Sequence, residues 1–372
     1  MKAIVLVGCG VVGATLAYEL SQHDNLNITV LDQQLPAQGA TGAALGILMG
    51  IISHKVKGRN WRLREASIRR YQTLLPELEA AVGYPIPHNP DGILTLCFDE
   101  AALPRWESLQ TIRQRQGWPL EIWSPQQILS TCSYLDLDGI VAGIYSPQDL
   151  QIDPKVLTQA LVEAAQQRGV TFCFDAPVTQ FCGQAKVDSQ EASQENRVTV
   201  VQTDRTEYPA DWLIVTAGLG STQLTQKLEQ PLPLTPVLGQ GIRVRLPQEL
   251  GSPDFRPVIN SDDVHLVPLG DRQYAVAATV EFPAADIPEP LPQAAALETV
   301  WQSAIAYCPV LAHAEILETW YGLRPRPQGQ AAPVIKKLEG YSNVVLATGH
   351  YRNGVLLAPA TAELVRRLIM EA

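Results

Sequence analysis

The chain has 372 residues, of which 46% are apolar and 18% are charged, and its formal net charge is -10. This composition is that of a globular protein and excludes an extended disordered chain. The acidic balance argues against general nucleic-acid binding, which needs a basic surface. No apolar run is long enough to cross a bilayer, so we expect neither a nucleic-acid partner nor a membrane span.

The N-terminus carries a glycine motif between apolar segments. Residues 3–7 are all apolar, which is typical of a central parallel strand covered on both faces. "GCGVVG" at 8–13 runs into a helical pattern, and residues 27–33 predict a second strand that contains Asp32. Strand, glycine turn, helix, strand and acid form the order of a dinucleotide-binding unit. The pattern alone leaves NAD and FAD both open.

Each residue of this motif has a physical role. Gly8 permits the tight turn, Gly10 lets a pyrophosphate approach the backbone, and Gly13 lets helix and strand pack closely. The helix N-terminus offers N–H groups and a positive dipole to phosphate. Asp32 is placed to bond ribose hydroxyls, and its charge would repel a 2′-phosphate.

The next segments are less diagnostic. Residues 39–52 are rich in glycine and alanine, which allows either a flat ring against the backbone or a tightly packed helix start. A basic run between Lys55 and Arg70 is interpreted as a solvated helix face, with steering of an anionic substrate as the alternative. Residues 60–83 predict an amphipathic helix, and a later helical pattern is expected to break at Pro104.

The second half of the chain contains both helix–strand units and segments of antiparallel strand. Residues 153–181 predict a helix capped by Asp153 and followed by a strand, and residues 211–218 predict another buried strand. "VLGQGIRVRL", "DDVHLVPL" and "RQYAVAATVEF" have hairpin-like spacing, so this region is expected to be antiparallel. A proline-rich linker at 282–292 leads to a helix over 293–306, and the last strand, "NVVLATG", leads to a helix over 361–370.

The six cysteines are scattered and form no CxxC pair and no metal-like grouping with histidine. We therefore expect reduced thiols, no metal site and a cytoplasmic location. The start "MKAIVLVGC" imitates a signal peptide, but glycines interrupt the apolar run early, which favours a buried strand.

Five motifs occur in the order found in the D-amino-acid oxidase superfamily of flavoproteins: GxGxxG with Asp32, "TGAALGIL", "VTAG", "YGLRP" and "GHYRNGVLLAPAT". The chain resembles the glycine oxidase branch of that superfamily. The resemblance implies an α/β fold, with a Rossmann-type FAD-binding domain interleaved with a smaller α+β substrate domain built on an antiparallel sheet. The expected boundaries are 1–85, 146–225 and 318–372 for the first domain, and 86–145 and 226–317 for the second.

The resemblance implies non-covalent FAD. The C-terminal turn would surround the flavin O2 side with backbone N–H groups and a helix dipole, which favour the negative charge of reduced flavin. The residues expected to contact FAD are Gly8, Gly10, Val11, Val12, Gly13, Asp32, Gln33, Thr41, Ala43, Ala44, Gly46, Ile47, Val178, Ala217, Gly218, His350, Tyr351, Arg352, Asn353, Gly354, Val355 and Leu356.

The same resemblance suggests substrate residues. Arg324 in "YGLRP" would clamp a carboxylate through its planar fork, unless it is a surface arginine held by Pro325. Arg352 would face the substrate or pair with a protein carboxylate. His265 stands where glycine oxidases have a tyrosine, and it would face either the pocket or a solvent or core partner.

The implied reaction is oxidative deamination of glycine or another small amino acid or amine. Hydride passes from Cα to flavin N5, the imine is hydrolysed, and dioxygen is reduced to hydrogen peroxide. No general base is required if the amine arrives neutral. The altered segment "RPQGQAAPVIKK" and His265 keep two alternatives open, an FAD dehydrogenase with another acceptor and a non-catalytic flavin-binding protein. An NAD-dependent dehydrogenase fits less well, and homo-oligomerisation is left open.

Overall fold

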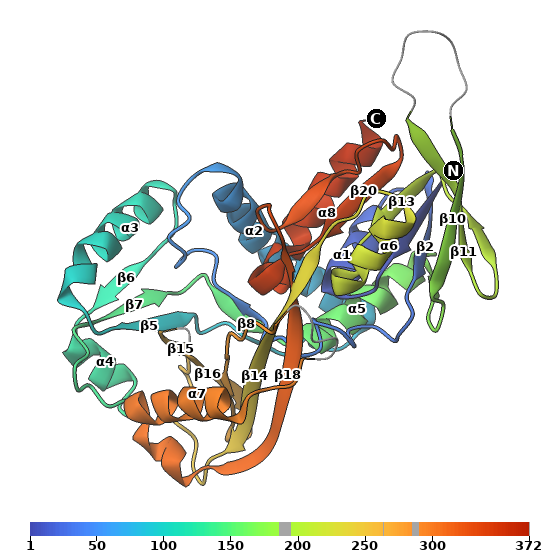
Figure 1. Cartoon of the computed structure of the whole chain (residues 1–372). Coiled ribbons are helices and arrows are strands. Elements are labelled where there is room, and N and C mark those ends of the chain that lie inside the picture. The colour runs from blue at the N-terminus through green and yellow to red at the C-terminus, as the bar shows by residue number, and fades with distance from the viewer. Residues whose placement is uncertain (186–194, 263, 285–289, 372) are drawn as a thin grey trace.

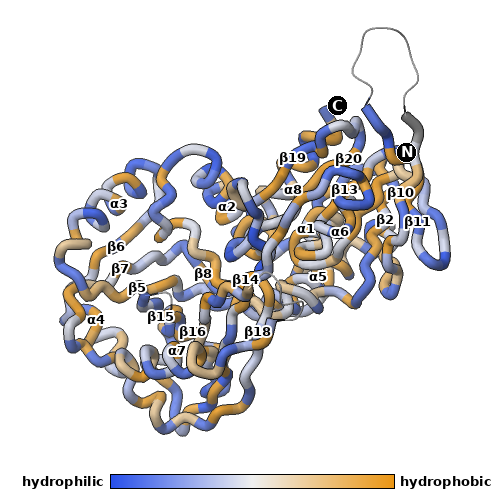
Figure 2. The backbone as a smooth tube through the Cα atoms, viewed as in Figure 1, coloured by the Kyte–Doolittle hydropathy of each residue, from blue (hydrophilic) through white to orange (hydrophobic). Residues whose placement is uncertain are grey.

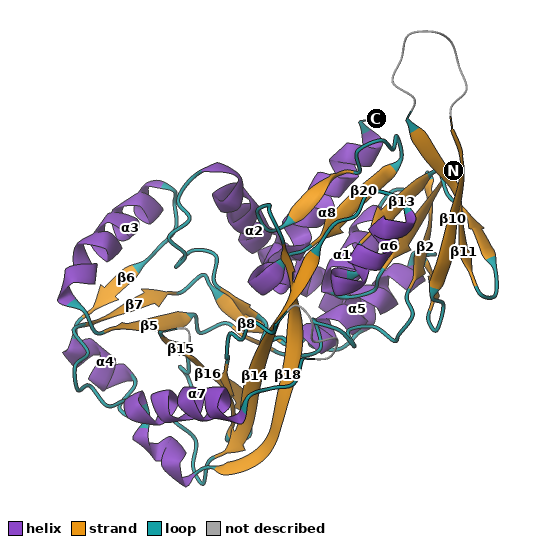
Figure 3. Ribbon diagram, in the orientation of Figure 1, coloured by secondary structure: helices purple, strands orange, loops and turns teal. Residues whose placement is uncertain are grey.

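The computed structural model describes residues 1–185, 195–262, 264–284 and 290–371. Its strands form two large sheets and two small ones, with helices packed around them (Figures 1 and 3). Both chain termini lie in the half that contains the six-stranded sheet (Figure 1). The long strands β14 and β18 extend from the other half towards it (Figure 1).

The six-stranded sheet begins with the N-terminal strand. β1 pairs in parallel with β2 and β13, so that Ile4 lies opposite both Ile28 and Trp212. β13 and β20 are buried along their whole length, as expected for parallel strands covered on both faces. The order is β19 (Val334–Lys337), β20 (Val344–Thr348), β13 (Trp212–Val215), β1 (Lys2–Val7), β2 (Leu26–Leu31) and β9 (Thr171–Cys173).

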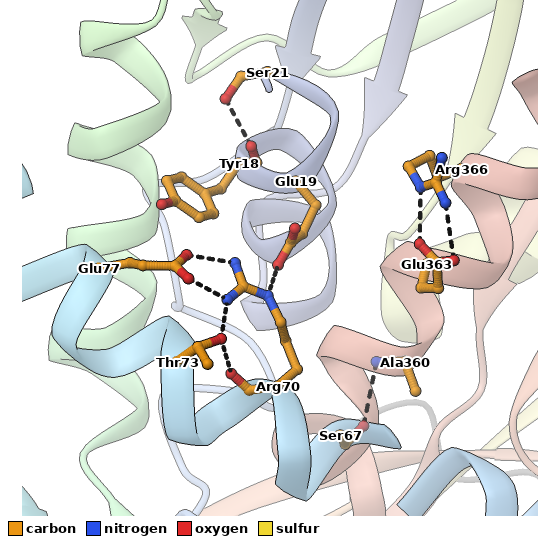
Figure 4. A network of polar contacts seen from close by, with 10 residues as sticks. All are labelled: Tyr18, Glu19, Ser21, Ser67, Arg70, Thr73, Glu77, Ala360, Glu363 and Arg366. Atoms are coloured by element: carbon orange, nitrogen blue, oxygen red, sulfur yellow. Dashed lines mark hydrogen bonds and ion pairs between the residues drawn. The ribbon is translucent and has the colours of Figure 1, made fainter. Parts of the chain in front are cut away.

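Four helices of this half share one large apolar core with the strands: α1 (Val11–Leu20), α2 (Gly58–Val82), α5 (Pro154–Gln167) and α8 (Gly354–Met370). Helix α6 (Ser221–Lys227) instead packs in a second apolar cluster. Arg70 of α2 pairs with Glu19 of α1 and with Glu77, and Ser67 accepts the N–H of Ala360 in α8 (Figure 4). These contacts fix α2 against both neighbouring helices.

The eight-stranded sheet is antiparallel except between β15 and β5. This confirms the predicted antiparallel region. Its order is β18 (Glu315–Pro327), β14 (Leu234–Arg245), β17 (Gln273–Ala277), β16 (Val264–Gly270), β15 (Val258–Ser261), β5 (Ile93–Cys97), β7 (Ala142–Ser146) and β6 (Glu121–Trp123). Helices α3 (Leu103–Arg115), α4 (Pro125–Thr131) and α7 (Ala294–Tyr307) lie around it (Figure 3).

The remaining elements are short. The small sheets comprise β10 (Val178–Ala185), β11 (Asn196–Thr203) and β12 (Glu207–Pro209), and β3 (Ile47–Leu48), β8 (Leu150–Ile152) and β4 (His88–Asn89). The 3-10 turns are η1 (Glu100–Ala102), η2 (Gly218–Gly220), η3 (Pro309–His313) and η4 (Tyr351–Asn353). Apolar and polar segments alternate along the chain in both halves (Figure 2). In the described ranges, no helix has the length and apolarity needed to cross a membrane.

Two helix boundaries differ from the sequence prediction. Pro104 does not break α3 but lies in its first turn, where the missing N–H leaves no helical bond unmade. The last helix starts at Gly354 rather than at 361 and contains Pro359. The cap by Asp153 is confirmed, since its carboxylate accepts the N–H groups of Lys155 and Val156. Part of the predicted linker, 285–289, lies outside the described residues.

Candidate active site

A cavity of about 600 Å³ brings distant segments of the chain together. Its wall includes the glycine turn after β1, the end of β2, the small-residue segment before β3, the strands β14 and β18, and the turn before α8. Every residue that the sequence analysis named as a site residue lines this cavity, except Gly13.

The glycine turn shows why these positions exclude side chains. Gly8 has φ +112°, and a Cβ there would lie 2.7 Å from the backbone of Ala217. A Cβ on Gly13 would lie 1.9 Å from the carbonyl oxygen of Gly8, so Gly13 packs against the turn instead of lining the cavity. Gly13 therefore lets α1 lie close to the turn after β1, and Gly8 lets that turn lie close to the segment after β13.

The N-terminus of α1 borders the cavity. Its N-cap, Gly10, has no side chain to cap the helix, and Val11 and Val12 of the first turn also line the wall. The N–H of Val11 donates to Thr41 Oγ1 at 3.0 Å, which joins the small-residue segment to the helix. A helix N-terminus that begins with glycine at a cavity is suited to a phosphate group.

Asp32 lies at the end of β2 and supplies the one carboxylate among the described residues that line the cavity. Its Oδ2 accepts the N–H of Cys9 at 2.6 Å, and its Oδ1 accepts the N–H of Gln34 at 2.9 Å. Burial raises the pKa of Asp32, and these backbone donors act in the opposite direction by favouring the charged form.

The small-residue segment meets β18. The indole N–H of Trp320 donates to the carbonyl of Ala43 at 3.1 Å. A Cβ on Gly322 would lie 2.3 Å from the Cβ of Ala43, so β18 can approach this closely only because residue 322 is glycine. The segment around Ala43 and Ala44 is thus held as a flat wall.

Arg324 lies on β18 in the wall of the cavity and is half-buried. Its Nη1 donates to the carbonyls of Leu238 and Thr279 at 3.0 and 3.1 Å. The guanidinium lies over Gly239 of the neighbouring strand, where a Cβ would be 2.1 Å from Nη2. The missing side chain at 239 leaves room for this orientation.

His265 lies on β16 with 8% of its surface exposed, and it lines the same cavity as Arg324. Its neighbours Val264 and Leu266 belong to the apolar core, as the alternation of a strand predicts. In the register of the sheet it lies opposite Asn260 and Ala277.

The turn before α8 contributes backbone more than side chains. Tyr351 has φ +55°, an uncommon value for a residue other than glycine. His350 Nε2 lies 2.9 Å from Thr361 Oγ1, whose hydroxyl donates to the carbonyl of Leu357, so Nε2 carries the imidazole proton. Burial, with a smaller effect of Arg59, lowers the pKa of His350 to about 3. The imidazole is therefore neutral, and it joins the turn to α8.

Arg352 of the same turn is exposed, although it also lines the cavity. The next residue, Asn353, accepts a hydrogen bond from Arg64 Nη2 at 3.2 Å. The backbone from Tyr351 to Leu356 follows the cavity wall into the first turn of α8.

Several lining residues escaped the sequence analysis, namely Met49, Ser53, Arg64, Gly239, Gln240 and Trp320. The paired glycines of "LGQGI" in a strand were a usable signal for the close approach at Gly239. The interpretation of the basic run as a solvated face holds for the exposed Lys55, Lys57, Arg59, Arg62 and Arg69, but it is wrong for Arg64, which is only 9% exposed. Arg64 lies on the same face of α2 as the buried Trp61, Ile68 and Tyr71, at helical spacing. This buried face could have identified Arg64 as a buried residue from the sequence.

Comparison with known proteins gives a consistent result. The family model described as DAO, FAD dependent oxidoreductase, matches residues 3–368. The chain is 31% identical over 379 residues to the bifunctional protein ThiO/ThiG of Synechocystis sp., covering 99% of this chain and 51% of that protein. It is 25% identical over 370 residues to glycine oxidase of Bacillus subtilis, covering 98% of this chain and 92% of that protein.

The fold also agrees with a solved structure. The crystal structure of glycine oxidase from Bacillus cereus matches with a TM-score of 0.84 at 22% identity, covering 100% of this chain and 96% of that one. The chain spans about half the length of the ThiO/ThiG proteins it matches. Since the family model covers nearly the whole sequence, the chain belongs to the DAO family of FAD dependent oxidoreductases.

Proposed function

We propose that this chain oxidises glycine or another small amino acid or amine at the carbon that bears the nitrogen, with dioxygen as the final acceptor. The observation that carries the proposal is the position of Arg324, whose guanidinium lines the same cavity as the dinucleotide motif. The names of the relatives, which include glycine oxidase, support the choice of substrate class.

The residues of the cavity fit FAD. The glycine turn leaves no room for a Cβ at Gly8 or Gly13, and the N-terminus of α1 is open to a pyrophosphate. Gly8, Gly10, Val11 and Asp32 would hold the ADP half, with Val178 beside the adenine. The wall from Thr41 to Ile47 and the backbone of 350–356 would surround the ring. Bound FAD supplies the acceptor for the two electrons that leave the substrate.

The protein's own groups position the substrate. Arg324 would bind the carboxylate through two parallel N–H bonds, because the carbonyls of Leu238 and Thr279 fix its Nη1. In that orientation the carbon next to the carboxylate would face the flavin-ring end of the cavity. The first turn of α8 directs N–H groups and a positive dipole to the same region, which favours negative charge there.

No protein base is part of the proposed reaction. Asp32, the carboxylate of the described lining, is bonded to the backbone at the end of β2 and belongs to the ribose region. The substrate amine would therefore lose its proton to water before oxidation. We further propose the domain boundaries given above, with 1–85, 146–225 and 318–372 binding FAD and the rest forming the substrate domain.

Purified protein tests the proposal directly. It should be yellow, release FAD on denaturation, and form hydrogen peroxide with glycine, sarcosine or small D-amino acids. Substrate-reduced protein that reoxidises slowly in air but rapidly with an electron-accepting dye would instead favour a dehydrogenase. A colourless protein without affinity for FAD would remove the basis of the proposal.

A further inference from the structure

A second arginine, Arg64 of α2, lines the cavity that contains Arg324. Only 9% of its surface is exposed, which is unusual for an arginine. Met49, Ser53 and Asn353 line the same cavity, and Asn353 is hydrogen-bonded to Arg64. A buried guanidinium that borders a cavity requires a counter-charge, because an uncompensated buried charge is costly.

The protein satisfies Arg64 only in part. Nη1 donates to the carbonyl of Asn60 at 3.3 Å, and Nη2 donates to Asn353 Oδ1 at 3.2 Å. Both acceptors are neutral, and both distances exceed the 2.7–2.9 Å or so of a charge-assisted bond. Among the residues that the structure describes, no acceptor lies within hydrogen-bonding distance of the buried Nε–H.

The nearest buried carboxylate is already occupied. Asp149 is fully buried and accepts the N–H groups of Gly50, Ile51 and Ile52, together with the hydroxyl of Ser146. Its charge acts on Arg64 without a hydrogen bond between the two side chains. Four donors already use the oxygens of Asp149.

A second buried cation competes for the same carboxylate. Arg113 is fully buried, stacks on Trp61 at 3.7 Å, and donates to the carbonyls of Ile51, Ser53 and Lys55. The charge of Asp149 therefore acts on both arginines. The two buried guanidiniums thus share one buried carboxylate, while the partly exposed Glu65 also acts on Arg113. Of the two arginines, Arg64 is the one that borders the cavity.

The position of Arg64 indicates which anion it can bind. A phosphate is expected at the N-terminus of α1, next to Gly10, whereas Arg64 contacts Asn353 at the start of α8. Met49 and Ser53 follow, along the chain, the segment assigned to the flavin ring. Arg64 thus lines the cavity beside Asn353, at the start of α8.

We propose that Arg64 binds a second acidic group of the substrate, so that the preferred substrate is an amino compound with two acidic groups. This inference rests on the proposed function, since it gives the first carboxylate to Arg324. The second N–H group of Nη1 and of Nη2, beyond those bonded to Asn60 and Asn353, would meet the two oxygens of that second group.

Inhibitor binding tests this without turnover. Malonate, succinate and glutarate are titrated against FAD-loaded protein, with acetate, propionate and butyrate as matched monocarboxylates. Calorimetry and the absorbance of bound FAD both report the affinity. The variants are Arg64→Met, which removes the charge, Arg64→Lys, which keeps it, and Arg62→Met, an exposed arginine of the same helix, as the control.

Wild type should bind at least one dicarboxylate about ten- to a hundredfold more tightly than its matched monocarboxylate. Arg64→Met should lose this preference while keeping its monocarboxylate affinity, Arg64→Lys should retain part of it, and Arg62→Met all of it. No preference in wild type overturns the proposal, and that result needs no variant. An unchanged preference in Arg64→Met, with a lowered FAD reduction potential, assigns the charge to the flavin instead and also overturns it. Failure of every amine to reduce the FAD would count against the proposed function, which this titration does not measure.

Discussion

Arg324 and Gly239 lie on neighbouring strands, and the guanidinium of Arg324 fills the space that a side chain at position 239 would need. A Cβ on Gly239 would lie 2.1 Å from Nη2 and 2.4 Å from Cζ. The carbonyls of Leu238 and Thr279 hold the guanidinium there from β14 and from the end of β17. The orientation of the proposed carboxylate clamp therefore depends on the absence of a side chain across the sheet.

Gly239→Ala should displace Arg324 and weaken substrate binding while FAD remains bound. The added Cβ has no room beside the guanidinium, and φ at 239 is not in the left-handed region, so the backbone itself tolerates alanine. We expect kcat/KM to fall about tenfold or more, mostly through KM. The effect should disappear in an Arg324→Ala background. An equal loss in both backgrounds would show that Gly239 acts on something other than Arg324.

Arg324→Ala should leave FAD bound and abolish efficient reduction by substrate. Loss of a charge-assisted contact costs about 2–3 kcal/mol, or about a hundredfold in affinity. Arg324→Lys should recover little of this loss, because an ammonium group lacks the planar fork. The measurement is the substrate dependence of anaerobic flavin reduction. Normal reduction in the alanine variant would exclude Arg324 as the carboxylate partner.

His265→Tyr should shift the substrate preference towards glycine. A protonated imidazole in the cavity wall repels an ammonium group and attracts an acid, whereas a phenol does neither. Identical substrate ranking in the variant would place His265 outside the functional part of the cavity.

His350→Gln should reduce the loss of stability in acid. Folded protein keeps His350 neutral down to about pH 3, whereas an unfolded histidine binds a proton below about pH 6.5. Between these values the unfolded state binds more protons than the folded state. The free energy of unfolding therefore decreases by up to about 1.4 kcal/mol for each pH unit by which the pH is lowered. Glutamine keeps an N–H donor for Thr361 without this titration.

The measurement for His350 is urea unfolding of FAD-loaded protein between pH 4 and pH 7 or so, a window that follows from the linkage. Carboxylates titrate in the same range, and the relevant quantity is therefore the difference in slope between wild type and variant. Parallel slopes would mean that His350 is not held neutral in the folded protein.

The fold was largely predictable because its signals are local. The glycine turn with Asp32 and the all-apolar strand at 3–7 identify a dinucleotide unit from spacing alone. The antiparallel region followed from the hairpin-like spacing of three segments, and the alternation of a strand explains why His265 points away from Val264 and Leu266.

The charged environment of Arg64 could not be predicted in the same way. Its surroundings come from Asp149, Arg113 and Asn353, which lie far from it in sequence and meet it only through tertiary packing. The contact between Arg324 and Gly239 likewise depends on the register of β14 and β18, which no local pattern specifies. The prediction that Pro104 breaks a helix was wrong because the sequence alone does not distinguish a proline in the first turn of a helix from one that ends it.

The most direct test of the account is an anaerobic titration of the purified, FAD-loaded protein with glycine and with small mono- and dicarboxylic amino acids. The account predicts that at least one of them bleaches the flavin absorbance completely, and that admitting air restores it with one hydrogen peroxide formed per flavin. Flavin that stays oxidised with every amine, in protein that binds FAD stoichiometrically, would contradict the claim that this cavity oxidises amino acids.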